Sequence, residues 1–157
     1  MLNIYILLVL GWCAVQFLML KFLKDKPFRI VSVMIAILWA AAVLFLTIFS
    51  RTPVLETRIK LIPFAGENTY GIHQTIIGMA ENAIMFFPLG GLLLGMFLQM
   101  KPWQAIVIGT GTSLFIELVQ LITYRGITAT EDLIANTIGC ALGVLVTLLL
   151  RRLVKRT

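Results

Sequence analysis

Four polar side chains share one face of an otherwise apolar segment in the second half of the chain. Thr110, Ser113, Glu117 and Gln120 are spaced i, i+3, i+7 and i+10, which places them on one side of an α-helix. Ionisable groups within a membrane usually face the interior of a helical bundle or water. Glu117 lies about five residues, or roughly 8 Å at 1.5 Å per residue, from the nearer end of the segment. We therefore expect Glu117 to bind a polar group or to take part in acid–base chemistry.

The last apolar segment repeats this pattern. Asp132, Asn136, Gly139 and Gly143 are spaced i, i+4, i+7 and i+11, again on one face. The two glycines form a small-xxx-small pair, which lets neighbouring helices approach closely, so this face should be packed and not exposed to lipid. Glu131 and Asp132 also fall in the first turn, where the helix dipole favours acidic side chains. A binding role and a purely structural role for Asp132 both stay open.

An earlier apolar segment carries Asn82, Pro88 and a second small-xxx-small pair, Gly91 and Gly95. Proline removes one backbone donor, so we expect a kink at Pro88 and a free carbonyl at Ile84 that needs a partner inside the bundle. The glycine pair should serve packing. Asn82 could join two helices by a hydrogen bond or contribute directly to a site.

Arg125 lies in a short turn between the fourth and fifth apolar segments. It could pair with Glu117 or Asp132, bind an anionic group through its forked guanidinium, or anchor the turn at the membrane surface. Three segments thus bring polar groups to a similar depth, which packing alone does not require. We predict a binding site formed by Asn82, Glu117, Gln120, Arg125, Asp132 and Asn136.

The composition places these residues in a membrane protein. Of 157 residues, 60% are hydrophobic and 13% charged, and the mean hydropathy is +1.00, whereas a soluble domain has about a quarter of its residues charged. The net charge of +6 does not indicate nucleic-acid binding, because the basic residues lie between apolar runs, where they set topology and contact lipid headgroups. Cys13 and Cys140 lie within apolar runs and His73 is the only histidine. We therefore expect no disulfide, metal site or cofactor.

Five apolar runs are long enough to span a bilayer, which takes about 20 residues. We therefore predict an all-α polytopic bundle of about five transmembrane helices, forming a single domain over residues 1–157 with one long outer loop at 50–75. The predicted helices cover about 2–20, 30–49, 80–100, 103–122 and 133–150.

The loop charges predict the orientation of the chain. With the N-terminus outside and the C-terminus in the cytoplasm, nine basic residues lie inside and four outside, which agrees with the positive-inside bias. Most acidic residues, and the predicted site, would then lie towards the outer side. The inner basic residues are Lys21, Lys24, Lys26, Arg29, Lys101, Arg151, Arg152, Lys155 and Arg156; the outer ones are Arg51, Arg58, Lys60 and Arg125.

Four blocks of the sequence resemble the VanZ-like family of bacterial membrane proteins. They are Leu-Ile-Pro-Phe at 61–64, Glu-Asn-Ala-Ile-Met-Phe-Phe-Pro-Leu-Gly at 81–90, Phe-Ile-Glu-Leu-Val-Gln at 115–120 and Glu-Asp-Leu-Ile-Ala-Asn-Thr-Ile-Gly at 131–139. The resemblance covers about residues 61–143; the family often has Asp at the position of Glu131. It implies a place in the bacterial cytoplasmic membrane and a role in resistance to glycopeptide antibiotics, above all the lipid-tailed teicoplanin type, or a housekeeping role in the envelope. It supplies no mechanism. It carries functional importance over to Asn82, Pro88, Glu117, Gln120, Asp132, Asn136 and Gly139.

Three functions fit these observations. In the first, an outward-facing pocket between the third, fourth and fifth helices binds an amphiphile, either a lipid-tailed glycopeptide or a lipid-linked wall precursor. In the second, Glu117 and Asp132 act as the acid and base of an intramembrane enzyme for a lipid headgroup or wall precursor, although no Ser-His or Cys-His pair supports it. The third is a small lipid transporter or flippase, for which five helices would need a homo-oligomer formed through the glycine pairs. We favour the first, a non-enzymatic function.

Overall fold

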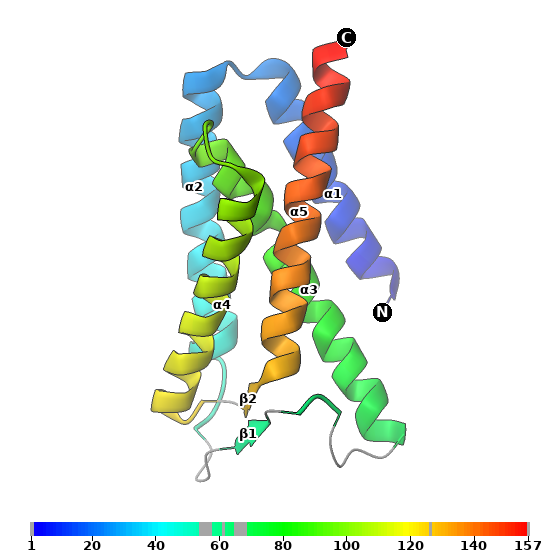
Figure 1. Cartoon of the computed structure of the whole chain (residues 1–157), viewed down its shortest axis with the longest axis vertical. Helices are drawn as coiled ribbons and strands as arrows, with labels where there is room; N and C mark the ends of the chain where they lie inside the picture. Colours follow the sequence, from blue (N-terminus) through cyan, green and yellow to red (C-terminus); the bar gives the residue numbers. More distant parts are fainter. Residues whose placement is uncertain (1, 54–57, 61, 65–68, 126, 157) are drawn as a thin grey trace.

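The structure is a bundle of five long helices with a small two-stranded sheet at one end (Figure 1). The computed structural model describes residues 2–53, 58–60, 62–64, 69–125 and 127–156. Its five helical stretches of 19 to 26 residues are long and apolar enough to cross a membrane, which confirms the predicted all-α membrane class. The elements are α1 (Leu2–Phe22), α2 (Asp25–Leu44), the π-helical turn η1 (Phe45–Phe49), β1 (Arg58–Lys60), α3 (Thr69–Met96), α4 (Pro102–Thr123), β2 (Ile127–Ala129) and α5 (Thr130–Arg156).

Three helices begin earlier than the sequence predicted. α2 begins at Asp25 instead of residue 30, because the first turn of a helix tolerates Pro27. α3 begins at Thr69 instead of residue 80 and ends at Met96. Its first turns contain glycine and polar residues, a pattern typical of loops, so the predicted loop 50–75 was too long. α5 already begins at Thr130 and continues to Arg156, where basic side chains favour a helix C-terminus.

A parallel pair of three-residue strands joins two distant segments of the chain. Arg58 of β1 lies opposite Ile127 of β2, and Lys60 lies opposite Ala129. Parallel strands need a long crossover, and here α3 and α4 provide it. The sequence did not predict this pair, because three residues are too few to show an alternating pattern. Leu61, the first residue of the 61–64 block, lies outside the described residues.

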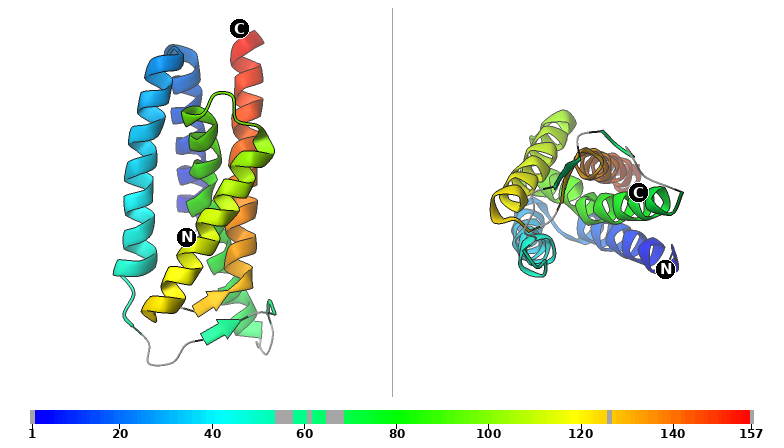
Figure 2. Two further views of the ribbon diagram at one scale, coloured as in Figure 1. Left: turned by 60° about the vertical axis from the view of Figure 1, so that its left-hand side comes forward. Right: turned by 90° about the horizontal axis from the view of Figure 1, so that it is seen from below.

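α3 is the central helix of the bundle, since it contacts each of the other four and packs most extensively on α5 (Figure 2). A Cβ added at Gly139 or Gly143 of α5 would collide with the carbonyl oxygen of Ala83 or Phe87 on α3. These two glycines therefore let the α3 and α5 backbones touch, as the small-xxx-small spacing predicted.

Gly91 and Gly95 of α3 make room for side chains of other helices. Gln16 of α1 and Thr147 of α5 occupy the space beside Gly91, and Ser32 of α2 occupies the space beside Gly95. Gln16 and Thr147 are both buried, and the Thr147 hydroxyl donates to Gln16 Oε1 at 3.0 Å. Both glycine pairs thus serve packing within one chain.

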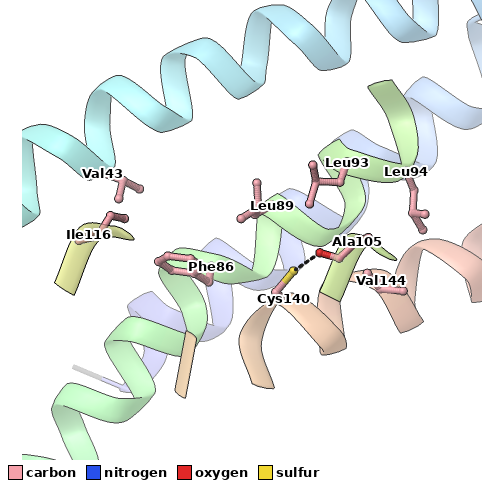
Figure 3. Close-up of a cluster of buried hydrophobic side chains, with 9 residues drawn as sticks. All are labelled: Val43, Phe86, Leu89, Leu93, Leu94, Ala105, Ile116, Cys140 and Val144. Atoms are coloured by element: carbon pink, nitrogen blue, oxygen red, sulfur yellow. Dashed lines mark hydrogen bonds between the residues drawn. The ribbon is translucent and has the colours of Figure 1, made fainter. Parts of the chain in front are cut away.

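An apolar core lies where α2, α3, α4 and α5 meet (Figure 3). Trp39 packs edge-on against Phe86 at its border, and the Trp39 Nε1 donates to the carbonyl of Met85 at 2.8 Å. Pro88 lies inside α3, which continues beyond it. The sequence predicted a partner for the carbonyl of Ile84; the donor from α2 reaches the next carbonyl along the helix. The buried core residues are Val43, Phe86, Leu89, Leu93, Leu94, Ala105, Ile116, Cys140 and Val144.

Apart from the charged end of α1 and the charged start of α2, the outer surfaces of these two helices are apolar. Leu7, Phe22 and Leu38 are 67–70% exposed. Exposed apolar area on this scale marks a surface that contacts lipid or another partner and not water. This supports the assignment to a membrane.

Candidate functional site

The polar face predicted on α4 is buried against α5. Asn136 Nδ2 donates to Ser113 Oγ at 2.8 Å, and the hydroxyl oxygens of Thr110 and Thr137 lie 3.1 Å apart. Ser113 and Asn136 are fully or almost fully buried, so neither faces lipid. The Asn136 Oδ1 is buried and has no hydrogen-bond partner among the described residues. This part of the predicted site is a set of buried polar contacts between α4 and α5.

Glu117 ties α4 to the sheet. Its Oε2 accepts a hydrogen bond from the backbone nitrogen of Ala129 at 3.3 Å, and its backbone carbonyl accepts one from Thr128 Oγ1 at 3.4 Å. The residue is 5% exposed. The charges of Arg51 and Asp132 lie within interaction range of its carboxyl group. Glu117 and Asp132 therefore lie near each other, and Glu117 also holds β2 in place.

Gln120 and Arg125 position the π-helical turn η1. Gln120 Nε2 donates to the carbonyl oxygen of Thr47 at 2.9 Å, and the Arg125 guanidinium donates to that of Ile48 at 3.1 Å. Carbonyls at the end of a helix lack partners within the helix and need donors from elsewhere. Arg125 thus attaches the α4–α5 turn to η1.

Asn82 and Asp132 connect α3 with the start of α5. The Asn82 side chain hydrogen-bonds the carboxyl group of Asp132, and the charges of Arg51, Lys60 and Glu131 lie within interaction range of the same carboxyl. The structure therefore brings the six predicted residues to one end of the bundle, where they form several separate contacts. We call this end, which carries β1 and β2, the sheet end.

A cavity of about 610 Å³ lies between α1, α2 and α3, and we call it the interhelical cavity. Its size is within the range of small-molecule sites. The polar side chains at its sheet end include Tyr5, Arg51, Glu81 and Asn82, and the Tyr5 hydroxyl donates to Glu81 Oε1. The sequence predicted a pocket between the third, fourth and fifth helices. The interhelical cavity instead lies between α3 and the first two helices. Its apolar wall includes Leu8, Trp12, Trp39, Leu46, Met85 and Phe87.

A second, smaller cavity of about 370 Å³ lies between the sheet and the starts of α3 and α5, and we call it the polar pocket. Arg51 lines both cavities. Glu131 is 3% exposed, and its Oε2 is buried without a hydrogen-bond partner among the described residues. The pocket is lined by Arg51, Lys60, Thr75, Gly78, Ala129, Glu131 and Asp132.

Several of these cavity-lining residues were not predicted from the sequence. Arg51 and Lys60 were interpreted only as topology signals, and Tyr5 was not considered. Glu81 carried a usable signal, because an acidic residue beside a long apolar run usually faces the protein interior or water. Among the residues described, no three His, Cys, Asp or Glu side chains lie close enough together to hold a metal ion.

Comparison with known families identifies the chain. The VanZ/LLP1 family model matches residues 30–151. The chain belongs to the VanZ/LLP1 family. The match includes most of α2 and all of η1 as well as the segment from residue 61 onward. It therefore covers the hydrogen bonds of Trp39 to Met85 and of Gln120 to Thr47. No curated protein and no solved structure matches this VanZ/LLP1 chain significantly.

Proposed function

We propose that this VanZ/LLP1 protein binds an amphiphile in the interhelical cavity and thereby contributes to resistance against lipid-tailed glycopeptide antibiotics. One observation carries the proposal: the cavity joins a long apolar wall to a charged sheet end. Trp12, Trp39 and Phe87 would contact an apolar tail, and Arg51 and Asn82 would hold the polar group. The apolar wall and the few polar groups at one end are what a site for an amphiphile requires.

The proposal places the sheet end at the outer face of the bacterial cytoplasmic membrane. The basic ends of α1, α2 and α5 lie at the other end of the bundle, together with Lys101, so the positive-inside bias favours this orientation. A lipid-tailed drug or a lipid-linked wall precursor would then enter the cavity from the outer leaflet. Protection would follow because binding in the cavity keeps the drug and its target apart.

Filling the cavity tests the proposal. Ala41 and Ala42 are neighbouring exposed residues, but only Ala42 lines the interhelical cavity. Ala42→Phe should therefore reduce growth in the presence of teicoplanin, and Ala41→Phe should protect as well as the wild-type chain. In vancomycin, which has no lipid tail, the difference in growth between cells with and without the protein should be smaller. Equal teicoplanin protection by both variants, at equal protein levels on immunoblots, would remove the interhelical cavity from the mechanism.

A further inference from the structure

We infer that the interhelical cavity and the polar pocket together hold one membrane lipid whose headgroup carries a primary ammonium beside a phosphate. The inference rests on the proposed function, because it names the resident ligand of the same amphiphile site. Apart from Arg51, the residues that line the polar pocket have no role in the proposed function.

The charges around the polar pocket favour a ligand that carries a positive group. Glu131 and Asp132 line the pocket together with Arg51 and Lys60, and Glu117 lies within interaction range of Asp132. Two carboxylates and two basic side chains therefore line the pocket. A purely anionic headgroup would leave the carboxylates without a ligand counter-charge, whereas a headgroup with both a phosphate and an ammonium complements both signs.

The position of Glu131 specifies the kind of ammonium. Its Oε2 is buried and has no donor among the described residues, and a buried acceptor without a donor costs free energy. The dipole of α5 explains an acidic residue in the first turn, but it does not provide this donor. A primary ammonium offers three N–H groups, whereas a quaternary ammonium offers none. The pocket should therefore distinguish an aminoethyl headgroup from its N-methylated form.

Arg51 and Asn82 connect the headgroup to the tail. Arg51 lines both cavities, and its guanidinium suits a phosphate, which it can bind through two parallel hydrogen bonds. Asn82 lines the interhelical cavity and hydrogen-bonds Asp132, which lines the polar pocket. A phosphate near Arg51 would thus leave the ammonium on the side of Glu131 and Asp132, and the acyl tail on the side of Trp12.

Lipid binding to the purified full-length protein in detergent tests the inference. Native mass spectrometry would compare phosphatidylethanolamine, its N,N-dimethyl form, phosphatidylcholine and phosphatidylglycerol with identical acyl chains. We expect phosphatidylethanolamine to bind about tenfold more tightly than phosphatidylcholine, as the loss of a charge-assisted hydrogen bond requires, with the dimethyl form between them. Equal binding of phosphatidylethanolamine and phosphatidylcholine, or of phosphatidylethanolamine and phosphatidylglycerol, overturns the inference.

Variants assign the selectivity to the pocket. Glu131→Gln keeps the shape of the side chain but removes its charge, and should abolish the preference for phosphatidylethanolamine. Arg51→Gln changes an exposed side chain and should weaken the binding of all four phospholipids. Asp25→Asn removes a carboxylate at the far end of the bundle and should change nothing. A preference that survives Glu131→Gln overturns the inference; should that variant fail to fold, Asp132→Asn is measured in the same way and judged by the same outcome.

Lipid binding is measured without an antibiotic, so its outcome is independent of the test of the proposed function. If phosphatidylethanolamine is selected but Ala42→Phe still protects cells, the lipid site stands and the resistance mechanism falls. If protection requires the cavity but no headgroup is selected, the resistance mechanism stands and the lipid inference falls.

Discussion

Asn82 on α3 is hydrogen-bonded to Asp132 at the start of α5, and each of the two residues lines a different cavity. About two helical turns further along α5, Gly139 brings the backbone against Ala83, the neighbour of Asn82. A polar contact and a close backbone approach therefore fix the same pair of helices. The geometry of both cavities depends on this pairing, because α3 contributes residues to the walls of both.

A larger residue at Gly139 should destabilise the protein. A valine there would collide with the carbonyl oxygen of Ala83, and α5 would have to move away from α3. We expect Gly139→Val to cost about 1–3 kcal/mol, the usual range for overpacking, and to lower the thermal melting temperature of the detergent-solubilised protein. Gly111→Val is the matched control, because no atom lies within 4 Å of a Cβ at Gly111. If both substitutions lower the melting temperature equally, the α3–α5 contact is not as tight as described.

The hydrogen bond and the charge of Glu117 can be separated with two variants. Glu117→Ala leaves the backbone nitrogen of Ala129 without its acceptor, which should cost about 1–3 kcal/mol. Glu117→Gln retains an acceptor oxygen, so it should melt close to the wild-type temperature. We nevertheless expect Glu117→Gln to lower teicoplanin tolerance at an unchanged protein level, because Asp132 and Arg51 lose a charged neighbour. Full tolerance of this variant would restrict Glu117 to a structural role.

Cysteine labelling tests the orientation of the bundle. Ser50 and Lys101 are exposed and lie at opposite ends of the bundle, and Ser50 is near the Ile48 carbonyl that Arg125 binds. In a chain without Cys13 and Cys140, a membrane-impermeant thiol reagent added to intact cells should label Ser50→Cys but not Lys101→Cys. Permeabilised cells should label both. The reverse pattern in intact cells would place the sheet end in the cytoplasm and exclude a drug site at the outer leaflet.

The helix faces were predictable from the sequence because they depend on local spacing alone. The i, i+3, i+7 and i+10 positions put Ser113 and Glu117 on the buried side of α4, and the small-xxx-small spacing put Gly139 against another helix. Both follow from the periodicity of a helix and the cost of exposing polar groups to lipid.

The neighbours of each face were not predictable in the same way. Nothing local to Gln120 indicates that its partner is the carbonyl of Thr47, and nothing local to Arg51 indicates that it lines two cavities. Such contacts depend on which helices lie side by side and on the π-helical turn that extends α2. The short strands depend on each other, since neither forms a ladder alone.

The parallel strand pair also constrains the order in which the protein can be made. β1 ends at Lys60 and its partner begins at Ile127, so two complete membrane helices must be synthesised and inserted between them. Until α4 has crossed the membrane, β1 lacks its partner and the polar pocket lacks Ala129, Glu131 and Asp132. Contacts so distant in sequence form late, because a long loop must close first. A nascent chain arrested before β2 would therefore carry the wall of the interhelical cavity but not the polar pocket beside it.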